Sequence, residues 1–216
     1  MSWDWQFVWA AMPGILRGLL TTLEITVLGS LLAYTLGLVL ALLRRVRGLG
    51  LVVRGFIEFV RSTPLLVQLF AVYYLFPSAL GIRMSAFATG VLVIGVHYAC
   101  YAAEVYRAGI DAVPRGQWEA ACALSLPRRR VWTAVVLPQA VPRVVPALGN
   151  YTISMFKETP LLLAISVVDL VNAAREEGSD AYRFVEVYTI AGVLFLLLSY
   201  PASLLVRRLE RRVAHP

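Results

Sequence analysis

The run Ile25–Leu43, "ITVLGSLLAYTLGLVLALL", contains no charged residue. A helix needs about 20 mainly apolar residues to cross the roughly 30 Å hydrocarbon core of a bilayer. The run therefore predicts a transmembrane helix, which we place near residues 18–43. Small residues recur in it at every fourth position: Gly29, Ala33, Gly37 and Ala41. This stripe favours close approach of a second helix, and chance in a Gly/Ala-rich span is the alternative.

The composition of the whole chain is typical of an integral membrane protein. Of its 216 residues, 59% are hydrophobic and 15% are charged, whereas about a quarter are charged in soluble domains. We predict an all-α membrane protein with a single transmembrane domain, residues 1–216. Its five predicted spans lie near 18–43, 55–77, 86–106, 144–168 and 184–206. The start, "MSWDWQFVWAAMPG", lacks the early positive charge of a signal peptide and predicts a retained aromatic belt at the membrane surface.

Basic residues predict the orientation of the spans. Fourteen of the 20 Lys and Arg residues follow spans one, three and five. The opposite connections hold Arg83, Arg175 and Arg183, together with several acidic residues. We therefore expect the N-terminus outside and the C-terminus in the cytoplasm. This distribution also explains the formal net charge of +7 without a nucleic-acid partner.

The connection 108–142 is too patterned to be a plain loop. "QWEAACAL" and "RRRVWTAVVL" both favour helix, with a break at 125–127 and an expected end of the second helix at Pro138. Two short helices with apolar faces at the membrane surface need a surface to bury them. A partner protein is the natural candidate.

This connection resembles the EAA segment of ABC importer permeases, EAA-x3-G-x9-I-x-LP. Glu119-Ala120-Ala121 begins the match, Ser125 replaces the usual Gly, and Val135 replaces the usual Ile before Leu137-Pro138. A Gly suits a turn with positive φ, which Ser tolerates less well. The resemblance implies that the segment docks on an ATPase. The residues expected to couple the two proteins are Gly116, Glu119, Ala120, Ala121, Ser125, Leu137 and Pro138.

The resemblance covers nearly the whole chain. "FVRSTPLLVQLFAVYY", "YAAEVYRAGIDAVPRGQWEAA" and "LPQAVPRVVPALGNY" resemble the polar-amino-acid branch of these permeases, whose members have five spans and an outside N-terminus. Within that branch, "VHYACYAAEVYRAGI" and "ALGNYTISMFKETPLLLAI" are most similar to the ectoine/hydroxyectoine permease subunits of the D type. Permeases for other polar amino acids, of the Arg, His, Gln or Glu type, are the alternative.

The family implies an assembly in the inner membrane. A second permease subunit, either a paralogue or a second copy, pairs around the translocation path, with membrane lipid around both. A cytoplasmic ATPase dimer binds ATP and Mg, and an extracytoplasmic binding protein delivers the substrate. This chain has no GxxxxGK[ST] phosphate loop, so we expect no cofactor and no enzymatic activity in it. Glu119 is expected to cap the first helix of the segment or to pair with a basic group of the ATPase; a solvated helix charge is the alternative.

Two similar motifs place charge inside predicted spans. "RSTPLL" occupies 61–66 and "KETPLL" occupies 157–162. Intramembrane charge is costly and is a functional hypothesis by default. Each proline also frees the carbonyl four residues before it, that of Val60 or Phe156. The residues proposed to line the substrate path are Glu58, Arg61, Thr63, Lys157, Glu158 and Thr159.

The charges in these motifs favour a zwitterionic substrate. Arg61 or Lys157 could meet a carboxylate, and Glu58 or Glu158 could meet a cation. Structural pairing is nearly as well supported, since Glu58 is three residues from Arg61 and Lys157 neighbours Glu158; gating is a third possibility. Glu104 is expected to pair with Arg107 at the membrane surface.

Other functional classes lack support in the sequence. His97 is expected to be a hydrogen-bonded packing residue, and His215 lies in the tail, so no metal site is predicted. No nucleophile elbow or catalytic triad is present. An ion-coupled secondary transporter is the main rival, and it leaves the EAA segment unexplained.

Overall fold

The computed structural model describes residues 3–214, and all regular structure in that range is helical. In chain order the elements are α1 (Trp5–Leu43), α2 (Leu49–Ser62), α3 (Leu65–Phe70), the π-helix η1 (Ala71–Leu75), α4 (Phe76–Leu80), α5 (Ala86–Asp111), α6 (Arg115–Ala123), α7 (Arg128–Arg130), the π-helix η2 (Val131–Val136), α8 (Leu137–Glu158), the 3₁₀ helix η3 (Thr159–Ile165), α9 (Leu170–Ala181) and α10 (Phe184–Ala214).

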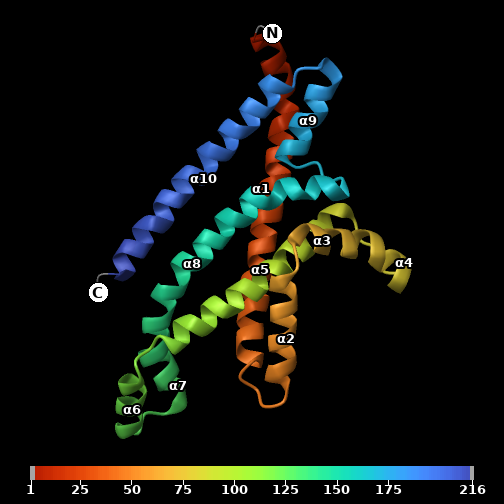
Figure 1. Ribbon diagram of the computed structural model, residues 1–216. Coiled ribbons are helices and arrows are strands. Elements are labelled where there is room, and N and C mark those ends of the chain that lie inside the picture. Colours follow the sequence, from red (N-terminus) through yellow and green to blue (C-terminus); the bar gives the residue numbers. More distant parts are fainter. Residues whose placement is uncertain (1–2, 215–216) are drawn as a thin grey trace.

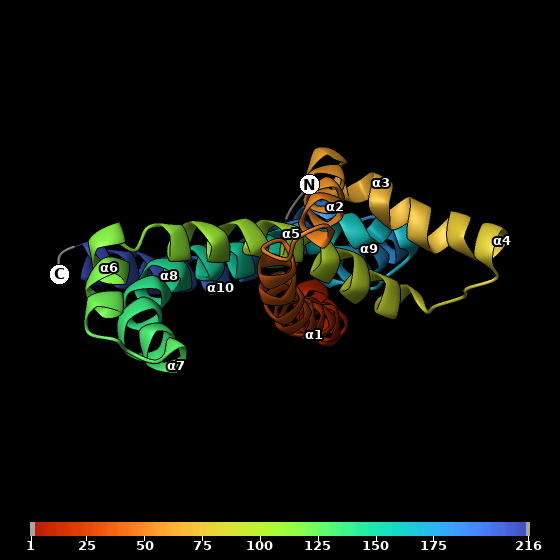
Figure 2. The same cartoon turned by 90° about the horizontal axis from the view of Figure 1, so that it is seen from below.

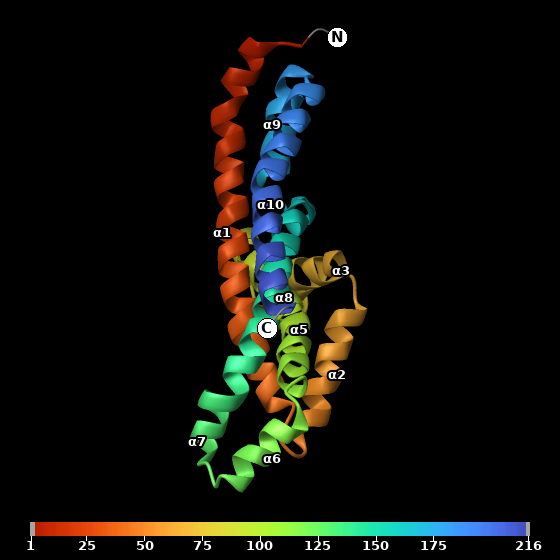
Figure 3. The same ribbon diagram turned by 90° about the vertical axis from the view of Figure 1, so that its left-hand side faces the viewer.

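Four segments are long and apolar enough to cross a membrane: Trp5–Leu43, Ala86–Asp111, Arg128–Ile165 and Phe184–Val213. A fifth candidate is the pair Leu49–Ser62 and Leu65–Leu80, which is bent by 105° at the break between its helices. The prediction of an all-α membrane protein is confirmed. Figures 1 and 3 show the N-terminus and α9 at one end of the molecule, and α6, α7 and the α1–α2 turn at the other.

The helix that contains the first predicted span is longer than that span. α1 begins at Trp5, thirteen residues before the expected start near 18. The Asp4 carboxylate caps it by accepting hydrogen bonds from the backbone N–H groups of Gln6, at 2.9 Å, and Phe7, at 3.1 Å. A side-chain cap of this kind satisfies the donors that a helix start leaves unpaired.

The second predicted span, 55–77, is not one straight helix. The chain turns sharply between Ser62 and Leu65, because Pro64 has no backbone N–H to continue the α-helical ladder. The fourth predicted span, 144–168, also differs, since α8 begins earlier, at Leu137, and gives way to η3 after Glu158.

The expectation that Pro138 ends a helix is wrong. The chain passes from η2 directly into α8, and Pro138 lies in the first turn of α8. Proline is tolerated in a first helical turn, and the π-helical turn before it widens the backbone. The second half of the EAA segment is therefore continuous with a membrane-spanning helix.

The small-residue stripe on α1 packs closely against α5. All four residues of the stripe are buried. A Cβ built on Gly37 would lie 2.8 Å from both the Ala102 Cβ and the Ala99 carbonyl oxygen. Close helix approach is thus confirmed, and it places α5 beside the whole second half of α1.

The start of α9 holds a buried carboxyl. Asp169 is 0% exposed, and its Oδ1 caps α9 by accepting from the Asn172 N–H at 3.0 Å. Its Oδ2 is buried without a hydrogen-bond partner among the described residues. Burial raises the pKa of Asp169 from 3.8 to about 6, although backbone hydrogen bonds oppose the shift.

This raised pKa predicts a pH-dependent stability. Between pH 4 and 6 the folded state binds more protons than the unfolded state, so stability is lost as pH rises, by about 2 kcal/mol in total. Asp169→Asn keeps an oxygen for the cap and removes the ionisation. The unfolding temperature of this variant in detergent should therefore not show the decline with rising pH. The exposed Asp180→Asn is the control. Identical pH profiles for wild type and Asp169→Asn would contradict the expectation.

Candidate functional site

The break between α2 and α3 is held by Gln68. Its Nε2 donates to the Val60 carbonyl and to the Thr63 hydroxyl oxygen, both at 2.7 Å, and lies 3.1 Å from the Thr63 carbonyl. The Val60 carbonyl is the one that Pro64 frees. Sequence reasoning identified this freed carbonyl but missed the side chain that satisfies it.

The threonine before each proline has the same role in both motifs. The Thr63 hydroxyl donates to the Val60 carbonyl at 3.1 Å, and the buried Thr159 hydroxyl donates to the Phe156 carbonyl at 3.0 Å. Each hydroxyl thus substitutes for the backbone N–H that the following proline lacks. This accounts for the Thr-Pro pair common to "RSTPLL" and "KETPLL".

A hollow of about 400 Å³ lies where the two motifs meet. Its size is within the range of small-molecule sites. It brings together Arg61, Thr63 and Glu158 of the predicted path residues, and adds His97 and Tyr101 from α5. The full lining is Arg61, Ser62, Thr63, Pro64, Leu65, Leu66, His97, Tyr101, Glu158 and Leu161.

The other predicted path residues lie elsewhere. Lys157 borders a separate hollow of about 490 Å³ with residues of α10, including Phe195 and Ser199. Glu58 is exposed on α2 and borders neither hollow. Thr159 is 0% exposed, and its hydroxyl is hydrogen-bonded to the Phe156 backbone carbonyl. The structure therefore divides the four charges that the sequence grouped together.

Arg61 presents its guanidinium over an aromatic ring. Its Cζ lies 5.0 Å from the centroid of Tyr101, a cation–π geometry. Between residues 3 and 214, no ion pair involves Glu58, Arg61, Lys157 or Glu158. The two local pairs considered from the sequence are therefore absent within this subunit, and the charge of Arg61 remains available at the hollow.

Glu158 lines the same hollow. Its Oε2 is buried and has no hydrogen-bond partner in the described part of the chain. A buried carboxylate oxygen without a donor is costly. The lining of the hollow therefore contains one carboxylate, Glu158, and one guanidinium, Arg61.

His97 lies between the hollow and the break between α2 and α3, where it contacts Gln68. Its Nδ1 lies 3.2 Å from the Gln68 Oε1, and because that oxygen can only accept, Nδ1 donates. The expectation of a hydrogen-bonded packing residue is confirmed, but His97 also lines the hollow. Its spacing of four residues from Tyr101 on one helix face is the signal that could have identified both. His215 lies outside the described residues.

Gln68→Leu is expected to disorder the α2–α3 break. The substitution keeps the side-chain size but leaves the Val60 carbonyl with only the longer bond from the Thr63 hydroxyl, at a cost of about 0.5–1.5 kcal/mol. We expect lower thermal stability together with reduced ligand binding at the hollow lined by Arg61 and Glu158. Gln139→Leu is the matched control, because Gln139 also donates to a helix carbonyl, Val135 at 2.8 Å, but in the EAA segment. Ligand binding equal to wild type would contradict this role of Gln68.

The turn of the EAA segment has the conformation that the family Gly favours. Ser125 has φ of 53°, in the left-handed region. The Leu126 N–H bonds to the Ala121 carbonyl at 3.1 Å and the Ser125 N–H to the Cys122 carbonyl at 2.9 Å. These two bonds form a Schellman motif at the end of α6, so the helix–turn–helix survives the substitution at some backbone strain.

The apolar faces of the EAA segment pack mostly on the chain itself. Trp118 and Trp132 meet edge to face at 5.6 Å between ring centroids, over a cluster that contains Ile110, Val113, Val136 and Ala140. The expectation that a partner must bury both faces is therefore too strong. Leu124, 73% exposed, is the main apolar side chain left for a partner.

The EAA residues point in different directions. Ala121 is buried, whereas Glu119 and Ala120 are exposed. Glu119 is the fifth residue of α6 and caps neither end, so its expected capping role is wrong and pairing with a partner stays a prediction. The remaining coupling candidates are also open to a partner: Gly116, Ser125, Leu137 and Pro138.

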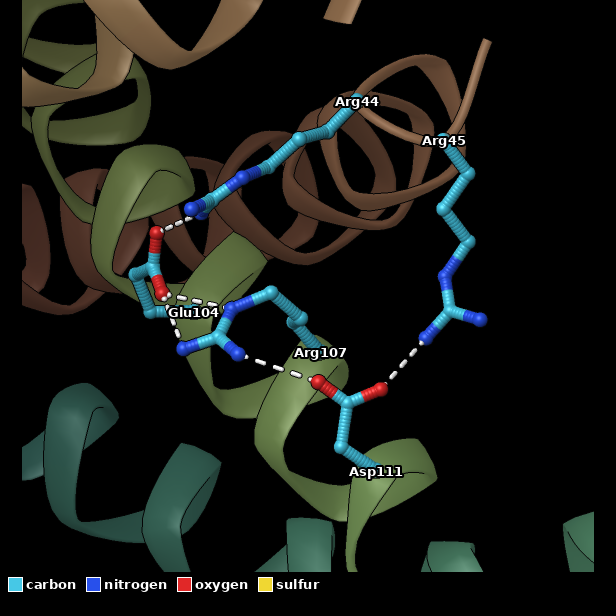
Figure 4. A network of polar contacts seen from close by, with 5 residues as sticks. All are labelled: Arg44, Arg45, Glu104, Arg107 and Asp111. Atoms are coloured by element: carbon cyan, nitrogen blue, oxygen red, sulfur yellow. Dashed lines mark hydrogen bonds and ion pairs between the residues drawn. The ribbon is translucent and has the colours of Figure 1, made fainter.

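An ion-pair network ties α1 to α5 near α6 (Figure 4). Glu104 pairs with Arg107 at 2.9 Å, as expected, and also with Arg44 of the α1 C-cap. Asp111 accepts from Arg107 at 3.0 Å and from Arg45 at 2.9 Å. The network fixes the end of α5 just before the EAA helix begins.

Comparison with known proteins gives one consistent family. A family model described as "Binding-protein-dependent transport system inner membrane component" matches residues 33–215. The chain is 45% identical over 203 residues to the probable amino-acid ABC transporter permease protein y4tG of Sinorhizobium fredii (strain NBRC 101917 / NGR234), covering 93% of this chain and 87% of that protein.

A second relative and a solved structure extend the similarity. The chain is 33% identical to the glutamine transport system permease protein GlnP of Escherichia coli (strain K12), covering 99% of both. It also matches the crystal structure described as an amino acid ABC transporter with histidines, with a TM-score of 0.90 and 34% identity over 98% of this chain and 100% of that one.

Proposed function

Because the chain belongs to the family of binding-protein-dependent transport system inner membrane components, as a permease subunit of an amino-acid ABC importer, we propose that the Arg61–Glu158 hollow receives a zwitterionic substrate. The protein is a multi-pass inner-membrane transport subunit, and its relatives are permeases rather than enzymes.

One observation carries the proposal: the two Thr-Pro motifs contribute opposite charges to one hollow. A guanidinium binds a carboxylate through two parallel hydrogen bonds, so Arg61 takes the substrate carboxylate. The Glu158 carboxylate takes the substrate ammonium or amidinium. Tyr101 holds the Arg61 side chain, and His97 adds a polar group from α5.

The substrate is a polar amino acid or an amino-acid derivative. One relative is named a glutamine permease, and a solved transporter that this chain resembles is described with histidines. The sequence resemblance adds ectoine and hydroxyectoine, which also carry a carboxylate and a cationic nitrogen group. We propose these two as the specific substrates within the broader class.

The ends of the molecule have different partners in this proposal. α6 docks on a cytoplasmic ATPase dimer, which binds ATP and Mg, and a second permease subunit, a copy or a paralogue, completes the path. An extracytoplasmic binding protein delivers substrate at the end that carries the N-terminus and α9 (Figure 1). The distribution of arginines supports this orientation.

Uptake into vesicles tests the proposal. Right-side-out vesicles that contain the permease and its ATPase, with the binding protein added outside, should take up labelled ectoine or glutamine only when they are loaded with ATP. Succinate and cadaverine, which carry one sign of charge, should not compete. Uptake that persists without ATP would overturn the importer mechanism. Uptake of glutamine with none of ectoine would overturn the specific assignment and leave the broader one standing.

A further inference from the structure

The turn between α1 and α2 gathers four arginines around a hollow of about 380 Å³. We call this the basic turn, defined by Arg44, Arg45, Arg47 and Arg54. Seen from below in Figure 2, it lies between the α6–α7 segment and the α3–α4 segment. It is separate from the Arg61–Glu158 hollow, and the transport mechanism proposed above does not use it.

The arginines of the basic turn exceed their local acidic partners. Arg44 and Arg45 reach the carboxylates of Glu104 and Asp111 (Figure 4), which Arg107 also shares. Arg47 and Arg54 are exposed and form no ion pair within residues 3–214. Three arginines therefore share two carboxylates, and Arg47 and Arg54 add unpaired positive charge at the hollow.

The backbone of the turn adds to this positive field. α2 begins after Gly48, whose φ is 83°, and no side chain caps its N-terminus. A Cβ at Gly50 would collide with the Arg44 carbonyl, so the close approach of the two helix ends requires glycine. The positive end of the α2 dipole thus adds to the guanidinium charges.

Apolar side chains continue directly from the charged hollow. Leu51 is 79% exposed and Val52 is 67% exposed, and Val46 and Leu49 are exposed beside them. The turn also follows the most apolar span, Trp5–Leu43. Cationic side chains at a membrane boundary with adjacent aliphatic side chains match an anionic headgroup and its acyl chains.

We propose that the basic turn binds the phosphate of an anionic phospholipid, with Arg47 and Arg54 as the principal contacts. The acyl chains lie along Leu51 and Val52. Because Arg44 and Arg45 join the turn to the end of α5, a bound lipid also steadies the helix end from which the EAA segment leaves.

Lipid retention measured by native mass spectrometry tests the proposal. The full-length protein is titrated with phosphatidylglycerol, with phosphatidylcholine and with inorganic phosphate. Arg47→Gln/Arg54→Gln leaves the ion-pair network intact and should weaken phosphatidylglycerol binding by about 30-fold, since each arginine near an anionic surface contributes about fivefold. Arg207→Gln/Arg208→Gln removes two exposed arginines of α10 and should change it less than twofold.

Three outcomes would overturn the proposal. The first is equal phosphatidylglycerol binding by wild type and Arg47→Gln/Arg54→Gln. The second is equal retention of phosphatidylcholine, or displacement of the lipid by millimolar inorganic phosphate, which would indicate a generic lipid contact or a free-anion site. The third is loss of ATPase association by the double variant with unchanged lipid retention, which would make the turn a protein-docking surface. Equal thermal stability in neutral detergent verifies that the variant folds.

Discussion

Replacing Glu158 by Gln should nearly abolish ATP-driven uptake while the protein still folds. The substitution keeps the shape of the side chain and removes its charge. Glu158 forms no ion pair within residues 3–214, so removing its charge breaks no salt bridge of the folded subunit. A substrate cation loses its partner, and such losses at buried charged contacts cost about 2–5 kcal/mol, or roughly 30-fold to several thousandfold in affinity.

Lys157 provides a control within the same motif. It precedes Glu158 directly but borders the second hollow, beside Phe195 and Ser199 of α10. Lys157→Met should therefore keep uptake within about twofold of wild type. From sequence alone the two residues were equivalent candidates, and only their different hollows separate them.

Glu158→Gln and Lys157→Met are compared in the complete complex. The measurements are the initial uptake rate and the dependence of ATPase activity on substrate concentration. Arg61→Gln should resemble Glu158→Gln, because it removes the charge on the other side of the same hollow. Normal uptake by Glu158→Gln with lowered thermal stability would show that the charge is structural. Equal loss in Lys157→Met and Glu158→Gln would show that the division into two hollows does not describe the path.

Much of the helical architecture follows from local properties of the sequence. The uncharged run Ile25–Leu43 predicts a membrane helix because burial in lipid requires internal backbone hydrogen bonds. Pro64 identifies where the chain bends, and Pro160 identifies where α8 gives way to the 3₁₀ helix η3, since a missing N–H acts on its own turn. The left-handed turn at Ser125 is likewise local and follows from the family preference for Gly at that position.

The grouping of charges could not be derived in this way. Glu58 and Arg61 are three residues apart, yet only Arg61 reaches the hollow, because the chain bends by 105° just after it. Glu158 joins Arg61 from a helix almost a hundred residues later, and no periodicity in either segment relates them. Gln68 was missed for a similar reason, since its amide bonds backward across the break to Val60.

The second large effect is expected from Glu119→Lys, at the end of the molecule that carries α6. Glu119 is exposed on α6 and forms no ion pair within residues 3–214. Reversing its charge should change folding stability by no more than about 0.5 kcal/mol, as is usual for such surface sites. If Glu119 meets a basic group of the ATPase, the reversal places two positive charges in contact and costs several kcal/mol of docking energy.

Copurification of the ATPase with the permease, together with uptake, measures this effect. We expect Glu119→Lys to insert and to unfold at the wild-type temperature, but to lose ATPase association and transport by at least about 30-fold. Glu176→Lys is the matched control for ATPase copurification, since Glu176 is also exposed but lies on α9 at the other end. Wild-type copurification and uptake by Glu119→Lys would mean that Glu119 is a solvated helix charge.

A neighbouring pair separates docking from folding within the same helix. Ala120 is exposed, whereas Ala121 is only 2% exposed. Ala120→Leu should therefore impair only ATPase association, whereas Ala121→Leu should overpack a buried position of α6 and lower thermal stability by about 1–3 kcal/mol. This contrast follows because the EAA sequence has two functions, with one alanine holding the segment together and the residues beside it facing the partner.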